Sequence, residues 1–198
     1  YEAESNYFTG WDYAIDQGFA YGSGMGTNHH YGYQIRKIYT TAWLMRKAIL
    51  KSSRRDDILK TLLFWSALQE TRRPCAEIRD EMLDSWNTLL QPKLISAMMI
   101  PDECARVQAL HGLSRWVSGS VNCTPGTIGG IKVDGTTFHH GGFYPAYTTG
   151  ALATVSDYIA MTGGTEFVPS LEARRLLASA FTAMRNYSNL IEWSTGLG

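Results

Sequence analysis

Four of the five histidines in this 198-residue chain occur as two adjacent pairs, and histidine is the side chain most easily tuned to transfer protons near neutral pH. His29-His30 follows Asn28 in a stretch rich in glycine and tyrosine, and His139-His140 lies in a second stretch of the same character. Functional residues are often found on loops that a rigid scaffold carries. The two segments therefore predict one site assembled from both.

A tyrosine seven residues after His140 offers a partner for proton transfer. Proline is favoured at the first helical position, so Pro145 predicts a helix that begins there and places Tyr147 in its first turn, just after Tyr144. The positive end of a helix favours a phenolate, and a free phenol titrates near ~10. Two glycines at 141–142 would let the His140 imidazole fold back toward the phenol.

Asn28 could likewise cap a helix that begins at His29. Both histidines would then lie at a helix N-terminus, where backbone N–H groups attract anions and a neutral imidazole is favoured over an imidazolium. Together the two segments suggest a site that binds an anion, stabilises negative charge and moves a proton. This chemistry suits proton abstraction α to a carboxylate, where each donor to the developing charge contributes roughly 3–4 kcal/mol.

Four segments, found in this order along the chain, carry a resemblance to a known family. They are residues 16–19, Asp-Gln-Gly-Phe; 29–33, His-His-Tyr-Gly-Tyr; 86–89, Trp-Asn-Thr-Leu; and 134–147, which begin with Asp-Gly-Thr and end with Tyr-Pro-Ala-Tyr. Each segment alone is a weak signal, whereas four in register are strong. The chain resembles polysaccharide lyase family 8 over nearly its whole length, and the histidine doublet at 29–30 resembles the chondroitin sulfate ABC lyase branch.

The resemblance implies that residues 1–198 form part of one catalytic domain, an all-α incomplete toroid of antiparallel helical hairpins. It implies eliminative cleavage of chondroitin or dermatan sulfate between hexosamine and uronic acid, leaving a 4,5-unsaturated uronate. It further implies a secreted or periplasmic enzyme whose downstream domains, together with a catalytic arginine and glutamate, lie beyond Gly198. The expected partner is a glycosaminoglycan polysaccharide.

The resemblance also implies roles for individual residues. His140 and Tyr147 match the family's catalytic histidine and tyrosine, and His29 falls where other branches carry an asparagine that neutralises the substrate carboxylate. Glucuronate and iduronate carry the C5 proton on opposite faces, so one base cannot reach both. We expect Tyr147 to act on glucuronate, and either His140 or one of His29 and His30 to act on iduronate. Expected substrate contacts come from the following residues: Asn28, His139, Tyr144, Trp11 and Arg36.

Composition excludes several other classes of protein. The 18 basic and 18 acidic residues cancel and form no basic block, so a nucleic-acid partner is not expected. No apolar run is long enough for a membrane span. The chain opens on Tyr1 instead of methionine, which suggests a processed protein or an excised piece.

The sequence gives little support for a metal site or for disulfide bonds. The three cysteines, an odd number without CxxC spacing, predict buried free thiols. Four histidines could hold zinc, but adjacent side chains diverge and no helical H-x3-H spacing occurs. We therefore expect no metal site among the predicted residues and no required cofactor, while a divalent cation, Ca²⁺ or Mg²⁺, remains compatible with the sequence.

Apolar residues recur at a helical period through most of the chain, which predicts the elements that must position the site. Helices are expected over residues 35–49, 58–68, 82–90, 102–117, 145–162 and 170–190, with at most short strands near 121–138. Residues 1–34 show little helical pattern. The prediction is an all-α domain without an internal boundary.

Two other functions fit parts of the sequence. Asp12 and Asp16 could form an acid–base pair of a glycoside hydrolase, although two carboxylates four residues apart are weak support for one. A non-catalytic glycosaminoglycan-binding segment would use the same aromatic loops. For Trp11, both stacking on a sugar and packing in a small core under the loop are open.

Overall fold

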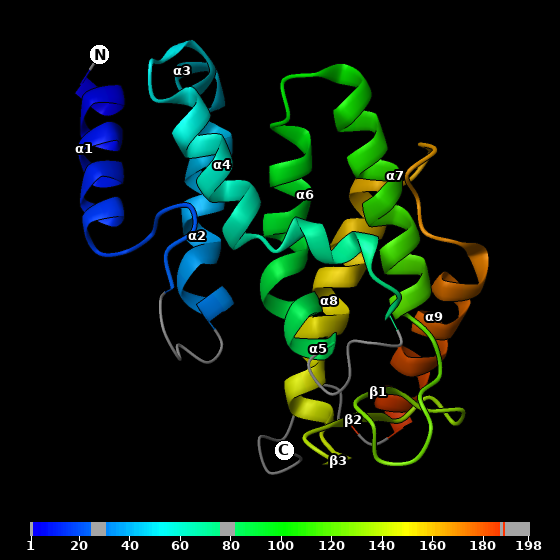
Figure 1. The fold of residues 1–198 in the computed structure, drawn as a ribbon. Helices are drawn as coiled ribbons and strands as arrows, with labels where there is room; N and C mark the ends of the chain where they lie inside the picture. The colour runs from blue at the N-terminus through cyan, green and yellow to red at the C-terminus, as the bar shows by residue number, and fades with distance from the viewer. Residues whose placement is uncertain (1, 25–30, 76–81, 187, 189–198) are drawn as a thin grey trace.

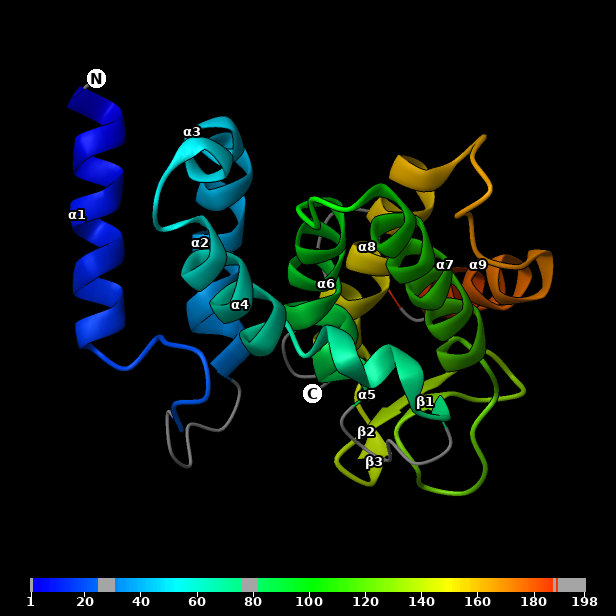
Figure 2. The same ribbon diagram turned by 45° about the horizontal axis from the view of Figure 1, so that its top comes forward.

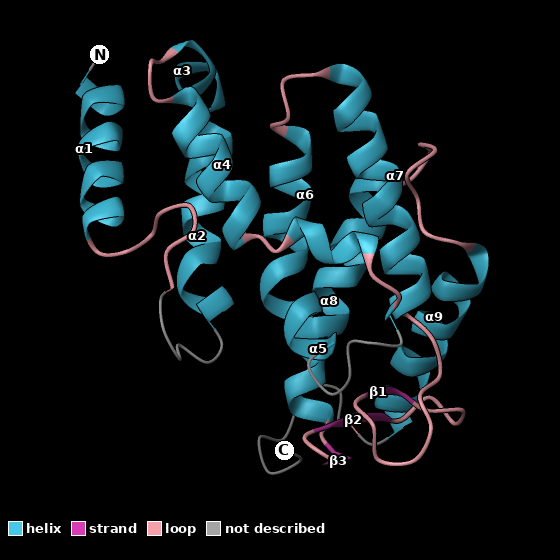
Figure 3. Ribbon diagram, viewed as in Figure 1, coloured by secondary structure: helices cyan, strands magenta, loops and turns pink. Residues whose placement is uncertain are grey.

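The computed structural model describes residues 2–24, 31–75, 82–186 and 188. The described chain consists mainly of helices, with one small antiparallel sheet at one end (Figures 1 and 3). The predicted all-α class is confirmed, while closure of the helices into a toroid stays a prediction. Asn28, His29 and His30 lie outside the described residues.

The N-terminal half contains a group of helices that stand side by side, with α1 at the edge of the molecule in both views (Figures 1 and 2). The elements are α1 (Glu2–Asp16), α2 (Tyr31–Leu44), α3 (Arg46–Lys51), α4 (Arg55–Trp65) and the 3-10 helix η1 (Leu68–Arg72). The helix α1 corrects the prediction that residues 1–34 lack helical structure. Its aromatic side chains pack on α4 and on the following loop, and such tertiary packing can stabilise a helix whose glycine and tyrosine content is unfavourable.

The C-terminal half begins with a continuous run of α5 (Met82–Asp84), the π-helical turn η3 (Ser85–Leu89) and α6 (Leu90–Met98). The helices α7 (Glu103–Ser120), α8 (Pro145–Thr162) and α9 (Leu171–Asn186) follow. Predicted helices over 102–117, 145–162 and 170–190 match α7, α8 and α9 closely. The strands are β1 (Gly130–Ile131), β2 (Thr137–His139) and β3 (Gly142–Phe143), paired in the order β1-β2-β3.

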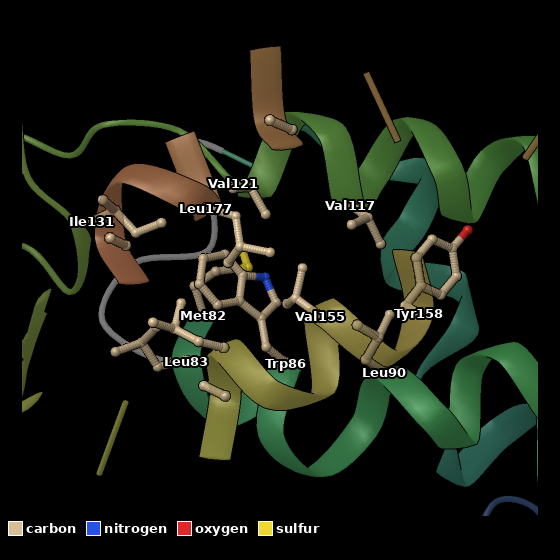
Figure 4. Packing of buried hydrophobic residues seen from close by; sticks show 14 of the residues in the cluster. Met82, Leu83, Trp86, Leu90, Val117, Val121, Ile131, Val155, Tyr158 and Leu177 are labelled. Carbon is tan, nitrogen blue, oxygen red and sulfur yellow. The ribbon is translucent and has the colours of Figure 1, made fainter. Parts of the chain in front are cut away.

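Two main clusters of buried apolar side chains hold these halves. The first cluster joins α1, α2 and α4 around Trp11, Tyr39 and Trp65. The second joins α5, η3, α6, α7, β1, α8 and α9 around Trp86 (Figure 4). The Trp86 indole Nε1 donates a hydrogen bond to Ser120 Oγ at 2.9 Å. The π-helical turn contacts both α2 and α8, so it connects the two halves.

Candidate active site

The predicted hairpin and helix start lie together at one end of the molecule (Figure 1). Pro145 opens α8 as expected, and Tyr147 is the third residue of that helix. The strand β2 packs against α8 and ends with His139, while His140 occupies the turn that leads to β3. The short sheet therefore brings the second histidine pair against the tyrosine.

The hydroxyl of Tyr147 belongs to a chain of hydrogen bonds whose other members lie on α2, α5 and η3. The amide Nδ2 of Asn87 donates to the Tyr33 hydroxyl at 2.8 Å, and the Tyr33 hydroxyl donates to the Tyr147 oxygen at 2.8 Å. The Tyr147 hydroxyl in turn donates to the carboxylate of Asp84. The phenol is thus connected to an amide donor on one side and to a proton-accepting carboxylate on the other.

The two adjacent histidines are placed differently. The His139 ring stacks on the Tyr147 ring with centroids 4.6 Å apart and planes 12° from parallel, and its Nε2 lies 3.7 Å from Asp84 Oδ2. His139 has 0% of its surface exposed. His140 is exposed, adopts a left-handed backbone with φ of 50°, and has its ring centroid 6.5 Å from that of Tyr147. Only His140 of this pair presents surface to solvent.

Local surroundings raise the pKa of the Tyr147 hydroxyl well above its ordinary value. Burial is the main cause, since it disfavours the phenolate, and the hydrogen bond to the Asp84 carboxylate adds to it. From the sequence we predicted the opposite, a lowered pKa, because the positive end of the helix dipole favours a phenolate. A hydrogen-bonded carboxylate next to the hydroxyl outweighs the partial charge of the helix end, which is typically worth less than ~1 kcal/mol.

The π-helical turn positions Asp84 and Asn87. Asp84 immediately precedes it, and the Thr88 hydroxyl donates to the Asp84 carbonyl oxygen at 2.8 Å. On its other side Gly32 of α2 lies so close that an added Cβ would meet Thr88 Oγ1 at 2.2 Å. This contact fixes Tyr33, the next residue, over Asn87. Single π-helical turns are frequent at functional sites because they redirect side chains within a helix.

A cavity of about 420 Å³ with a mixed polar and apolar lining lies next to the hydrogen-bonded chain, between α2, η3, α6 and α8. Asn87 lines it, as do Arg36 and Asp157. The Arg36 guanidinium lies 5.4 Å from the centroid of the Tyr33 ring. Arg36, predicted to contact substrate, therefore has one side at a cavity and the other at the hydroxyl chain.

The remaining predicted substrate contacts divide into two groups. Tyr144 is half-buried with its ring centroid 5.6 Å from that of Tyr147, so it belongs to the site. Trp11 is only 3% exposed and packs in the first cluster against Phe19. Its faces are covered, which corrects the sugar-stacking assignment in favour of core packing. The complete burial of His139 likewise opposes direct substrate contact.

Sequence reasoning missed Tyr33, Asp84 and Asn87 as site residues. Tyr33 and Asn87 fall within the segments that carried the resemblance, but their types alone gave no reason to pair them. Asp84 had a usable signal, because it is the one acidic residue in the run Met82-Leu83-Asp84-Ser85-Trp86, whose other members are buried. A carboxylate inside a buried apolar run usually has a specific partner.

Within the described ranges no three histidine, cysteine, aspartate or glutamate side chains gather closely enough to hold a metal ion. Cys75, Cys104 and Cys123 are free thiols, but the predicted burial is wrong, because Cys104 and Cys123 are exposed and Cys75 is half-buried. In the part of the chain that the structure describes, no helix combines the length and apolar character that crossing a bilayer requires.

The mainly helical fold, with a tyrosine, a histidine and a carboxylate at one end, suits a lyase domain. Residues 1–198 match the family described as "Lyase, catalytic", and the chain belongs to that family. It is 33% identical over 192 residues to a chondroitin sulfate ABC exolyase of Bacteroides thetaiotaomicron, which covers 97% of this chain and 19% of the relative.

Two relatives from Proteus vulgaris show similar agreement. A chondroitin sulfate ABC exolyase is 31% identical over 185 residues, covering 93% of this chain and 19% of the relative. A chondroitin sulfate ABC endolyase is 29% identical over 177 residues, covering 88% of this chain and 17% of the relative. The chain thus spans about a fifth of the length of the curated relatives it matches.

Proposed function

We propose that the protein containing this chain cleaves chondroitin or dermatan sulfate by eliminating the uronic acid C5 proton and the glycosidic oxygen. The hydrogen-bonded pair of Tyr147 and Asp84 beside the exposed His140 is the observation that carries this proposal. Membership of the lyase family and relatives named for chondroitin sulfate support the substrate class. A secreted or periplasmic location belongs to the same proposal, since a polymeric substrate is met outside the cytoplasm.

The raised pKa of Tyr147 determines how this phenol would act as a base. As its oxygen takes the C5 proton, its own hydroxyl proton passes to Asp84 along the hydrogen bond between them. The electron pair left at C5 forms the 4,5 double bond and expels the glycosidic oxygen. That oxygen takes a proton from Tyr147, and Asp84 returns its proton to the phenol. Protons balance over the cycle without a free phenolate.

The other residues bind and orient the substrate in this proposal. The donor chain from Asn87 through Tyr33 holds the phenol oxygen in place while its proton moves. His140, exposed beside the phenol, is the candidate base for iduronate, as are His29 and His30. Buried His139 stacks on Tyr147 and fixes the plane of its ring.

The main test is Tyr147→Phe in the full-length protein, assayed for ultraviolet-absorbing unsaturated product on chondroitin and dermatan sulfate. Loss of a general acid–base group lowers rates by roughly 10²–10⁴-fold, so activity on both polymers should fall at least ~100-fold. The matched control is Tyr13→Phe, because Tyr13 is exposed on α1. Full activity of Tyr147→Phe on either polymer contradicts the assignment, and new reducing ends without ultraviolet absorbance would indicate a hydrolase.

Asp84→Asn tests the proton path separately. An amide cannot take the phenol proton, so the variant should be slow at neutral pH. Removing the carboxylate also removes one cause of the raised pKa of Tyr147. Activity should therefore recover as the pH rises and the phenol ionises directly, shifting the rate profile to higher pH than that of the wild type. An unshifted profile with normal activity would exclude Asp84 from the reaction.

A further inference from the structure

A loop between α7 and β1 wraps around the ammonium group of Lys132. The loop closes on itself where the Thr124 backbone N–H donates to the Ile131 carbonyl oxygen at 2.9 Å. Lys132 follows β1 directly and is only 9% exposed. A lysine is almost never this buried unless partners replace the water around its charge.

The partners of this ammonium include three neutral oxygens and an aromatic face. Lys132 Nζ donates to Thr124 Oγ1 at 3.0 Å, to the Thr124 carbonyl oxygen at 3.3 Å and to the Ile128 carbonyl oxygen. It also lies 4.8 Å from the centroid of the Phe138 ring. Carbonyl and hydroxyl oxygens with a ring face are the surroundings that K⁺ and alkylammonium ions accept.

The walls of this cage are closely packed. Gly130 has φ of 128°, and an added Cβ would meet the Thr124 side chain at 2.9 Å, so only glycine lets Thr124 approach. Gly130 pairs with Phe138 across β1 and β2. The cage is therefore joined through Phe138 to the next residue, His139, which stacks on Tyr147.

We propose that the loop over residues 122–132 is a binding site for a monovalent cation whose resident cation is the Lys132 ammonium. The side chain supplies covalently the charge that the loop oxygens and the Phe138 face require, and it holds the hairpin on which His139 lies. Removing the side chain should leave an oxygen-lined site that K⁺ or a small alkylammonium ion can fill. This inference concerns ion binding and does not depend on the proposed lyase reaction.

The test is Lys132→Ala in the full-length protein, followed by thermal unfolding at constant ionic strength in sodium chloride. The midpoint should fall by about 3 °C or more. Adding propylammonium chloride, which replaces the deleted atoms, or potassium chloride should recover at least half of that loss, increasingly with concentration. Lys132→Met should show no recovery, because its side chain still fills the cage. Lys60→Ala, at an exposed position on α4, should not lower the midpoint.

Three results would overturn the proposal: a midpoint equal to that of Lys60→Ala, a loss that neither potassium nor propylammonium recovers, or recovery by magnesium chloride alone. If Lys132→Ala does not fold, reductive methylation of the wild-type protein with mass spectrometry replaces it. Lys132 should then react at least about tenfold more slowly than Lys60, because its exchange with solvent requires local opening. Equal rates would show that the ammonium is not enclosed.

Discussion

Two buried lysines, one in the helical half of the site and one in its hairpin half, are stabilised by different kinds of partner. Lys93 on α6 is fully buried and pairs with the Glu70 carboxylate at 3.1 Å. Its ammonium also donates a hydrogen bond to the Ser85 hydroxyl at 3.3 Å. Lys132 instead contacts carbonyl oxygens of its own loop. Each lysine contacts a residue that is next to a site residue in the sequence: Lys93 contacts Ser85, which follows Asp84, and Lys132 contacts Phe138, which precedes His139.

The difference follows from what the backbone has available. Inside a helix, carbonyl oxygens already accept hydrogen bonds from residues four positions on, so a buried ammonium there needs a side-chain anion. In a loop, carbonyls such as those of Thr124 and Ile128 can turn toward a cation. The buried ammonium in the helical region thus has a carboxylate partner, whereas backbone carbonyl oxygens are among the partners of the one in the loop.

The largest expected effect comes from breaking the charged pair. Glu70→Gln leaves Lys93 buried without its anion, and breaking a buried pair costs about 3–5 kcal/mol. Since the Glu70 side chain is 32% exposed, we expect the low end of this range, about 3 kcal/mol, in urea unfolding. Lys93→Met should cost less than about 1 kcal/mol, because the remaining glutamate can be hydrated. Equal losses in the two variants would contradict the asymmetry.

The same pair predicts a pH dependence. Burial lowers the pKa of Lys93 below its ordinary value of 10.5, with Glu70 offsetting part of the shift. Between the lowered pKa and 10.5 the unfolded chain binds more protons, so the free energy of unfolding should rise with pH in that window. Lys93→Met should lose this rise. Measurements should stay below pH ~10, above which unfolded tyrosines begin to ionise.

A smaller effect is expected where α2 meets the π-helical turn. Gly32→Ala would place a Cβ 2.2 Å from Thr88 Oγ1, and overpacking of this kind costs about 1–3 kcal/mol. The neighbouring Tyr33 should shift with it, so activity should fall as well. The matched control is Gly10→Ala on α1, where an added Cβ has nothing within 4 Å and alanine favours the helix. A similar change in both variants would show that α2 can move away from the turn freely.

In the hairpin half the backbone itself is the sensitive feature. His140 has φ of 50°, a left-handed conformation that costs non-glycine residues roughly 1–2 kcal/mol. His140→Gly and His140→Val both remove the imidazole and should both reduce activity. The valine variant should be less stable than the glycine variant by about 1–2 kcal/mol in urea unfolding. Equal stabilities would mean that the turn relaxes to another backbone conformation.

Sequence periodicity predicted α7, α8 and α9 closely, but it missed α1 and the break at Met45 between α2 and α3. The helices α7, α8 and α9 carry regular apolar stripes, and their starts have Asp102, Pro145 and Ser170 as signals. In contrast, α1 contains Gly10 and several aromatic residues, and its Trp11 belongs to a buried cluster that includes residues of α2 and α4. Such tertiary contacts are invisible to a local pattern.

The candidate site, like the set of helices, could be predicted only in part. The proximity of His140 and Tyr147 could be predicted, because only a short turn and the start of a helix separate them in the sequence. Asp84 and Tyr33, however, reach Tyr147 from positions 63 and 114 residues away. No local pattern indicates that separation. Burial is the main reason that the pKa of Tyr147 is raised, and these two distant partners add to it, which explains why reasoning from the helix dipole alone gave the wrong direction.

The smallest expected effect concerns the cap at the start of α7. The first N–H groups of α7 lack intrahelical acceptors, and Asp102 accepts a hydrogen bond from the Ala105 N–H at 2.7 Å. Asp102→Ala should lower the free energy of unfolding by about 1 kcal/mol and leave activity unchanged, since the start of α7 lies at the end of the molecule opposite the hairpin (Figure 1). Asp102→Asn keeps the acceptor but removes the charge, so it should cost only a few tenths of that. If Asp102→Asn lowers the free energy of unfolding as much as Asp102→Ala does, the carboxylate stabilises α7 through its charge. The start of α7 would then depend on an anion, as buried Lys93 does.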